Sequence, residues 1–218
     1  MLFDWMLTLA DYPQREVLLR RAAAIIGRSI SDAAVEELLV GMARADADSE
    51  VVEAMSRCDC SAAEHEHAEM LHFRRSGLDE ELARAWYSLL GRPGTHPIYA
   101  EVPALLHTLA SHDVRVVVIS DIHVDLRMHA RAAGIEALVD GWVLSYEHGV
   151  QKPDLQIYEL GLDVAGVDAS DALMVGDRHV ADGTASLLGV DSLILPARLE
   201  RDPLVIDSRL DGVARLSL

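Results

Sequence analysis

Hydrophobic and polar positions recur along this chain with two different spacings, and the change of spacing divides the chain into three stretches. Residues 1–11 begin with a short apolar run, which predicts a buried strand and a turn, with Asp4 near the strand end. From about residue 13 to 92, apolar positions recur at helical spacing and no run predicts a strand. One such helical set is Val35, Leu38, Leu39 and Met42.

Capping residues support helices in the middle stretch. Ser31 precedes one periodic run, Ser61 with Glu64 forms a capping-box pattern, and Asp79 precedes a third run. The residues Gly91-Arg92-Pro93-Gly94 then interrupt the pattern and predict a return linker. We therefore expect a helical unit over residues 12–96, inserted into a core made of residues 1–11 and 97–218.

Predicted strands and helices alternate in the last stretch. The expected helices cover about residues 98–111, 124–133, 153–165 and 182–188, and the expected strands cover 114–119, 141–145, 172–175 and 192–195. Pro153 is expected in the first turn of its helix, and Gly134 and Gly189 just after helix ends. This alternation predicts an α/β fold, a doubly wound parallel sheet with helices on both faces.

Polar side chains follow three of the predicted strands. Asp4, Ser120 and Asp177 each stand where a strand ends, and Lys152 lies in a loop that could reach the same edge. In open α/β sheets, ligands bind beyond the carboxyl ends of the strands. We expect these four residues to converge on one crevice.

Lys152 is the single lysine of the chain, against 18 arginines. Its compact ammonium has three rotatable donors, whereas the planar guanidinium of arginine would bridge neighbouring acids differently. A lysine retained beside two carboxylates at strand ends predicts a site for a phosphate and a metal ion.

Composition excludes several classes of function. Half of the 218 residues are hydrophobic, and the net charge of −17 argues against a surface that binds nucleic acid. No apolar stretch approaches the roughly 20 residues that span a bilayer, and no signal peptide is evident. Cys58 and Cys60 are too close for an ordinary structural disulfide, so we expect a reducing, cytoplasmic location. Nothing in the pattern predicts an oligomeric state.

Four motifs in order resemble the haloacid-dehalogenase-like (HAD) superfamily over nearly the whole chain. They are Phe3-Asp4-Trp5-Met6-Leu7-Thr8-Leu9, Val117-Val118-Ile119-Ser120, Gly149-Val150-Gln151-Lys152-Pro153-Asp154, and Val175-Gly176-Asp177 with Asp182. The helical insertion after the first motif is similar to the helical cap of that family. The resemblance implies hydrolysis of a small phosphorylated metabolite.

The resemblance also implies roles for these residues. Asp4 would be the nucleophile that forms an aspartyl-phosphate. Ser120 would donate a hydrogen bond to the phosphoryl group, Lys152 would neutralise charge between Asp4 and the phosphate, and Thr8 would order the loop after Asp4.

A Mg²⁺ ion is the cofactor that the resemblance implies. Its ligands would be the Asp4 carboxylate, the backbone carbonyl of Met6 and Asp177, with Asp182 in or next to the coordination sphere. Oxygen ligands with retained waters are what Mg²⁺ prefers.

Met6 departs from the pattern of the family's phosphatases, which carry a second aspartate there as general acid and base. Losing a positioned acid and base costs about 10²–10⁴ in rate. Three explanations stay open. A histidine among His123, His148 and His179 could carry the proton; the chain could act as a 2-haloacid dehalogenase; or it could be a catalytically impaired protein that binds ligands in a regulatory role.

A run of cysteines and histidines in the insertion suggests zinc only weakly. Its members are Cys58, Cys60, His65, His67 and His72. Their spacing fits no common zinc finger, and His65 and His67 would point to different sides of a helix. We expect Ser61–Phe73 to be a helix that lines the cap near the active site.

Overall fold

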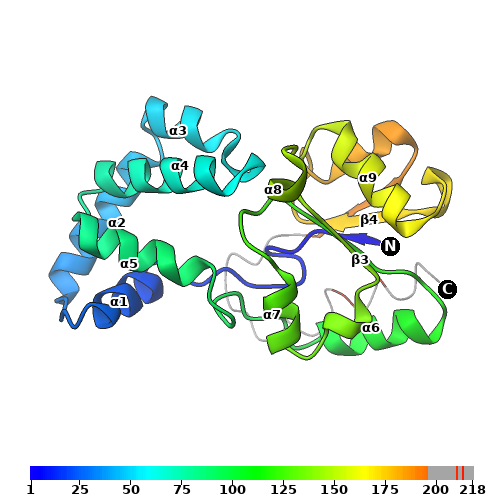
Figure 1. Cartoon of the computed structure of the whole chain (residues 1–218), viewed down its shortest axis with the longest axis horizontal. Coiled ribbons are helices and arrows are strands. Elements are labelled where there is room, and N and C mark those ends of the chain that lie inside the picture. The colour runs from blue at the N-terminus through cyan, green and yellow to red at the C-terminus, as the bar shows by residue number, and fades with distance from the viewer. Residues whose placement is uncertain (196–209, 211–212, 214–218) are drawn as a thin grey trace.

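The computed structural model of the chain describes residues 1–195, Leu210 and Val213. The rest of the expected core, at 196–209, 211–212 and 214–218, lies outside the described residues. Figure 1 shows a helical part beside a part built around a sheet. Among the described helices, none combines the length and the apolar character needed to cross a bilayer.

A parallel sheet occupies the centre of the core. Within the described residues it has five strands in the order β3-β2-β1-β4-β5. These are β1 (Leu2–Phe3), β2 (Val117–Ser120), β3 (Gly141–Leu144), β4 (Leu173–Gly176) and β5 (Asp191–Ile194). Phe3 of the central strand pairs with Val118 on one side and Val175 on the other. The first strand in sequence therefore lies in the middle of the sheet.

Helices cover both faces of the sheet, as Figure 1 shows. On one face, α6 (Val102–Ser111) and α7 (Arg127–Ala132) pack with Phe3, and on the other, α9 (Leu155–Ala165) packs with Leu2. This division follows from the strand, because neighbouring side chains point to opposite faces. Short elements complete the core: η2 (Glu136–Leu138), α8 (Ser145–His148), η3 (Ala169–Asp171) and η4 (Gly183–Leu188). The doubly wound parallel sheet that the sequence predicts is confirmed.

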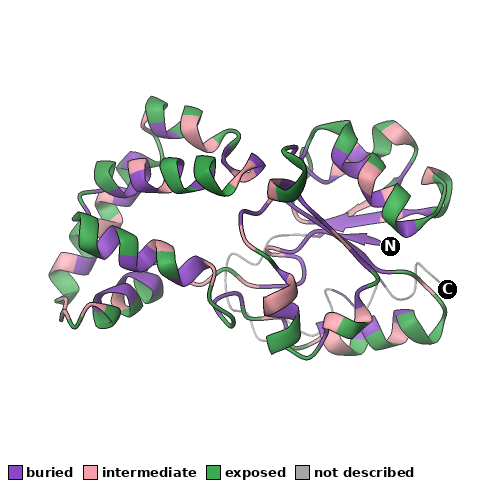
Figure 2. Ribbon diagram, viewed as in Figure 1, coloured by how far each residue is buried: buried purple, intermediate pink, exposed green. Residues whose placement is uncertain are grey.

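The helical insertion between β1 and α6, called the cap below, has a hydrophobic core of its own. Its elements are α1 (Arg15–Ile25), α2 (Asp32–Ala45), α3 (Ser49–Met55), η1 (Cys58–Cys60), α4 (Ala62–Arg75) and α5 (Glu80–Leu90). Figure 2 shows buried residues on their inner faces. The two linkers pair with each other, since the Asp11 N–H donates to the Pro97 carbonyl and the Tyr99 N–H donates to the Leu9 carbonyl.

The predicted helix caps are confirmed. The side chains of Ser31, Ser61 and Asp79 accept hydrogen bonds from backbone N–H groups in the first turns of α2, α4 and α5. The capping box at Ser61 is only half formed, because the Glu64 carboxylate accepts from the Ser61 hydroxyl. One N–H at the start of α4 is thus satisfied as expected.

Several predicted elements differ from the structure in bounds or type. The helix expected over 124–133 is α7 (Arg127–Ala132), and the strand expected over 114–119 is β2 (Val117–Ser120). Pro153 precedes its helix, because the Asp154 carboxylate caps the Gln156 N–H and α9 begins at Leu155. The helix expected from residue 98 begins at Val102, because Ile98 pairs with Ala10 in the linker bridge. The segment expected as a helix over 182–188 is a 3₁₀ helix, η4.

Gly41 allows the end of α4 to approach α2 closely. A Cβ at this position would lie 2.2 Å from the backbone carbonyl oxygen of Ser76. We expect Gly41→Ala to lower the free energy of unfolding by about 1–3 kcal/mol, although alanine favours helices, because a backbone atom must move. Urea unfolding followed by circular dichroism measures this change.

Gly183→Ala is the matched control, because a Cβ at Gly183 would meet no atom within 4 Å. A Gly41→Ala variant as stable as the wild type would contradict the close approach of the two helices.

Candidate active site

The candidate site lies at the carboxyl edge of the three neighbouring strands β2, β1 and β4. Asp4 follows β1, and its N–H continues the ladder by donating to the Val175 carbonyl at 2.8 Å. Ser120 is the last residue of β2, and Asp177 follows β4. The sheet thus brings together three of the residues that the sequence singles out.

Lys152 joins this edge through two buried ion pairs. Its Nζ lies 2.8 Å from Asp4 Oδ1 and 2.6 Å from Asp182 Oδ1. The side chains of Lys152 and Asp182 are fully buried, and that of Asp4 is 6% exposed. Breaking a buried pair leaves an uncompensated charge, so this contact constrains the whole site.

Asp182 is held in place from two directions. Its Oδ1 accepts from Lys152, and its Oδ2 accepts from the Arg178 backbone N–H at 2.9 Å. A Cβ at Gly176 would lie 2.1 Å from Asp182 Cγ. Glycine at the end of β4 is therefore what allows the carboxylate to reach the lysine.

Asp121 and Arg178 belong to the same network, and sequence reasoning missed both. Asp121 Oδ1 accepts from the Lys152 backbone N–H at 2.8 Å, and its Oδ2 accepts from Arg178 Nη2 at 2.8 Å. The signal was available, because each residue directly follows a predicted strand-end residue, Ser120 and Asp177.

Burial shifts the pKa values of these groups. Burial raises the pKa of Asp4 to about 6, although the Lys152 ammonium lowers it. The Asp182 carboxylate also raises the pKa of Asp4. Burial also raises the pKa values of Asp121 and Asp177. For Lys152, burial disfavours the charged form, but the carboxylates of Asp4 and Asp182 outweigh it and raise the lysine pKa.

The charges around Asp4 are unbalanced when all groups are ionised. Four carboxylates, Asp4, Asp121, Asp177 and Asp182, face two cationic side chains, Lys152 and Arg178. One ligand oxygen each of Asp4, Asp177 and Asp182 lies within 4.8 Å of the others. Two uncompensated negative charges and an all-oxygen donor set fit a hard divalent cation such as Mg²⁺.

Ser120 and Thr8 present buried hydroxyls to this region of the fold. Neither Oγ has a hydrogen-bond partner among the described residues. A buried hydroxyl without a partner is costly, so the Ser120 hydroxyl is a suitable donor for a ligand at the strand edge. Backbone hydrogen bonds hold the loop after Asp4, since the N–H groups of Leu9 and Ala10 each donate to the Trp5 carbonyl at 2.9 Å.

Met6 lies in this loop, half-buried, and pairs with Ala10 in an isolated bridge. The next residue, Leu7, has φ of 56°, a left-handed conformation that favours glycine. The loop therefore keeps a glycine-like backbone turn without glycine. The thioether side chain of Met6 has no proton to transfer.

The three histidines considered as proton carriers lie in different surroundings. His148 and His179 are exposed, whereas His123 is buried. The His123 ring stacks on His65 of α4, with ring centroids 3.2 Å apart. His123 therefore contacts the cap.

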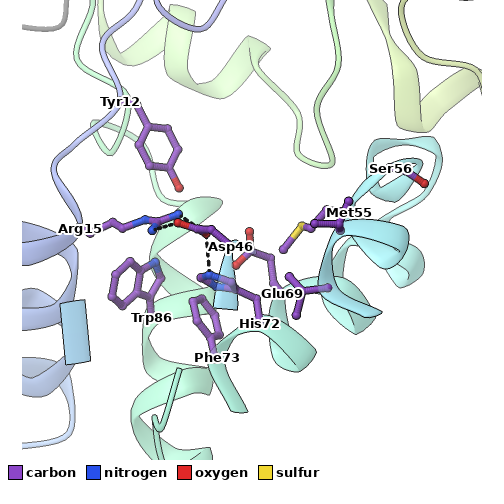
Figure 3. Close-up of a pocket in the computed structure, with 11 residues that line it drawn as sticks. Tyr12, Arg15, Asp46, Met55, Ser56, Glu69, His72, Phe73 and Trp86 are labelled. Carbon is purple, nitrogen blue, oxygen red and sulfur yellow. Dashed lines mark hydrogen bonds and ion pairs between the residues drawn. The ribbon is translucent and has the colours of Figure 1, made fainter. Parts of the chain in front are cut away.

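A pocket of about 510 Å³ lies in the cap (Figure 3). Arg15 of α1 binds Asp46 through two hydrogen bonds of 2.7 and 2.9 Å, and His72 Nε2 lies 3.0 Å from Asp46 Oδ1. Figure 3 shows Tyr12 from the linker pointing its hydroxyl toward this group. The apolar part of the lining comprises Val51, Val52, Met55, Phe73 and Trp86.

Removing the charge of Lys152 tests the buried ion pairs. We expect Lys152→Met to lower the free energy of unfolding by about 3–5 kcal/mol at pH 8, because two buried carboxylates lose their counter-ion. The loss should be smaller at pH 5, where protonation neutralises carboxyls whose pKa values burial raises. Urea unfolding at both pH values measures it.

The double variant Lys152→Met/Asp182→Asn should recover part of the loss, because one of the two stranded charges is gone. Equal loss at pH 5 and pH 8 would show that Lys152 stabilises the fold through packing alone.

Glu69, which also lines the pocket, makes a second pH-dependent contribution to stability. Burial, together with Asp59 and Asp46, raises its pKa from 4.5 to about 7 despite the nearby Arg15. The folded state therefore binds a proton more tightly than the unfolded state, and wild-type stability falls as pH rises from 4.5 to about 7.

We expect Glu69→Gln to unfold with a free energy higher than that of the wild type by up to about 3 kcal/mol at pH 8, and nearly equal to it at pH 4. Thermal and urea unfolding in EDTA measure this difference. Glu66→Gln, at an exposed position on the same helix, is the control. A gain that does not grow with pH would contradict the raised pKa of Glu69.

Comparisons with known proteins indicate the family of this chain. The protein-family model for haloacid dehalogenase-like hydrolases matches residues 8–185. The matched range includes Ser120, Lys152, Asp177 and Asp182, and begins after Asp4. A comparison with curated proteins found no match.

Solved structures of both dehalogenases and phosphatases share the fold. The L-2-haloacid dehalogenase of Xanthobacter autotrophicus is 19% identical, with a TM-score of 0.65 over 97% of this chain and 81% of that one. A HAD phosphatase from Thermococcus onnurineus is 20% identical, with a TM-score of 0.57 over 92% and 87% of the two chains.

A HAD family enzyme from Bacteroides thetaiotaomicron, in complex with magnesium and inorganic phosphate, is 15% identical. Its TM-score is 0.59, over 93% of this chain and 96% of that one. Since the family match covers most of the sequence, the chain belongs to the haloacid dehalogenase-like hydrolases.

Proposed function

We propose that this HAD-like hydrolase is a Mg²⁺-dependent phosphatase, which cleaves a small phosphorylated metabolite through an aspartyl-phosphate at Asp4. The observation that carries the proposal is the excess of carboxylates over cationic side chains around a buried aspartate. Such a site repels an anionic phosphate unless a divalent cation is bound, and its oxygen donors suit Mg²⁺. The solved complex of a similar fold with magnesium and inorganic phosphate supports the same class of chemistry.

Asp4 would act as the nucleophile. Lys152 binds its Oδ1 and so favours the ionised carboxylate, while Oδ2 has no hydrogen bond to a described residue. Attack of a carboxylate oxygen on phosphorus forms one O–P bond as the bond to the leaving group breaks. Water then cleaves the aspartyl-phosphate and releases inorganic phosphate.

Asp4, Asp177 and the backbone carbonyl of Met6 would hold the metal ion. Both oxygens of Asp182 are already engaged by Lys152 and Arg178, so Asp182 would act by positioning the lysine. The bound ion supplies charge neutralisation for the phosphoryl oxygens. The Ser120 hydroxyl would donate to the same group.

Met6 narrows the class of substrate. Because its side chain cannot donate a proton, a leaving group must depart as a stable anion, as in aryl and acyl phosphates. The cap pocket beside Tyr12 and Arg15 would take the organic part of the substrate, since its apolar lining with a few polar groups is typical of small-molecule sites.

Dehalogenation of a 2-haloacid is the second candidate. A halide needs no proton to depart, so Met6 is compatible with displacement by Asp4. The neighbouring folds include 2-haloacid dehalogenases. This chemistry proceeds without metal in the family, and the acidic cluster of Asp4, Asp177 and Asp182 would then have no cation to bind.

The proposal is tested by turnover of an aryl phosphate and an acyl phosphate, which have good leaving groups, and of an alkyl phosphate, which has a poor one, with Mg²⁺ and in EDTA. We expect wild-type turnover only with Mg²⁺, none in Asp4→Asn, and a gain of about 10²–10⁴ in Met6→Asp for poor leaving groups. The rate gain in Met6→Asp should be small for good leaving groups, because these depart without a proton.

The same samples should be offered a 2-haloacid. Halide release by the wild type in EDTA would overturn the phosphatase proposal in favour of dehalogenation. Phosphatase activity in Met6→Asp alone would indicate a protein whose present role is binding, with hydrolysis lost at one position.

A further inference from the structure

A second group of metal-ligating side chains lies where the cap contacts the core. Cys58, Asp59 and His65 each offer one ligand atom, and these atoms lie within 4.8 Å of one another. His123, from the loop after β2, faces the same group, with Nδ1 3.9 Å from Asp59 Oδ1. His65 Nε2 lies 4.0 Å from the same oxygen. Three potential ligands therefore lie close together, and a fourth, His123, lies beside Asp59.

The two histidines of this group are buried without hydrogen bonds. His65 is 6% exposed and His123 is 9% exposed. Nδ1 of His65 and both ring nitrogens of His123 have no partner among the described residues. Buried polar atoms are normally satisfied, because an unpaired one costs free energy. Of these nitrogens, His123 Nδ1 is the one that faces Asp59, and it indicates a ligand there.

We propose that Cys58, Asp59 and His65 of the cap, together with His123 of the core, bind one divalent ion of the zinc class. A mixed set of sulfur, nitrogen and oxygen ligands is typical of Zn²⁺ and does not suit Mg²⁺. A tetrahedral Zn²⁺ with bonds of about 2.0–2.3 Å keeps its ligand atoms about 3.3–3.8 Å apart. The two histidine–Asp59 separations, 4.0 and 3.9 Å, are close to this range, and the stacked rings of His65 and His123 would rotate so that both bind one ion.

The protonation state of His65 fits this binding, whereas Cys58 must lose its proton. Burial, and then the neighbouring His123, lower the pKa of His65 to about 3, so its imidazole is neutral, which is the ligating form. Burial and Asp59 raise the pKa of the Cys58 thiol to about 12. Binding of the ion converts this thiol to a thiolate and releases one proton to solvent.

The ion would link the cap to the catalytic loops. Around the cluster, the Ser145 hydroxyl donates to the Asp59 carbonyl at 2.6 Å, and Gln151 Nε2 donates to the Ser56 carbonyl at 2.9 Å. Gln151 directly precedes Lys152, and His123 lies three residues after Ser120. A metal bond from cap to core would hold the cap docked beside these residues.

Cobalt binding tests the site without any assay of turnover. The chain, stripped with EDTA and returned to buffer with excess Mg²⁺, is titrated with Co²⁺ and then with competing Zn²⁺. We expect one equivalent to produce a near-ultraviolet thiolate-to-cobalt absorption band, which Zn²⁺ removes. The band should be absent in Cys58→Ser, and affinity should fall about tenfold or more in His65→Ala and His123→Ala.

Matched controls separate this site from its surroundings. Cys60→Ser and His67→Ala alter the same segment outside the cluster and should keep the band. Asp4→Asn should also keep it, because the proposed zinc-class site is independent of the proposed phosphatase site. If Cys58→Ser fails to fold, the nearly isosteric Asp59→Asn should weaken Co²⁺ binding about tenfold.

Three outcomes would overturn the proposal. They are the absence of a band in the wild type, a band that survives in Cys58→Ser but is lost in Cys60→Ser, and wild-type Co²⁺ affinity in His123→Ala. The last would show a site confined to the cap, with no metal link to the core.

Discussion

The buried ammonium of Lys152 is the interaction on which the rest of the site depends. It binds Asp4 at the end of β1 and Asp182 beyond β4, so one side chain joins the two strands that carry the acidic residues. Glycine at position 176 is required because Asp182 must approach β4 closely to reach it. The lysine backbone N–H binds Asp121 as well, which brings the loop after β2 into the same network. Loss of this cation would leave charges stranded inside the protein.

The excess of carboxylates around Lys152 ties the electrostatics of the fold to its chemistry. Burial raises the pKa of Asp4, and in the proposed mechanism this carboxylate has to be ionised to attack. A bound divalent cation would favour ionisation and would also offset repulsion between the site and an anionic substrate. Met6 affects proton transfer alone. Its side chain cannot act as an acid or base, while the backbone of the loop keeps its turn.

The cap contributes in two separate places. Its pocket combines the Arg15–Asp46–His72 network with apolar walls, a combination suited to a small organic group. Its other end, around Asp59, touches the core through Ser145 and Gln151, next to the lysine loop. The contacts that hold the cap against the core therefore lie close to the proposed active site in both sequence and space.

Sequence alone determined the features that depend on local chemistry and on strand order. The period of the apolar positions predicted the helical insertion and the parallel sheet, the caps at Ser31, Ser61 and Asp79 were found from residue type, and Asp4, Ser120 and Asp177 were placed at strand ends. Only the tertiary structure decided that Asp121 and Arg178 complete the network around Lys152. It also brought His123 against His65, 58 residues earlier in the chain. Both depend on how loops from different elements pack together, and contacts between distant segments leave no periodic signal in the sequence.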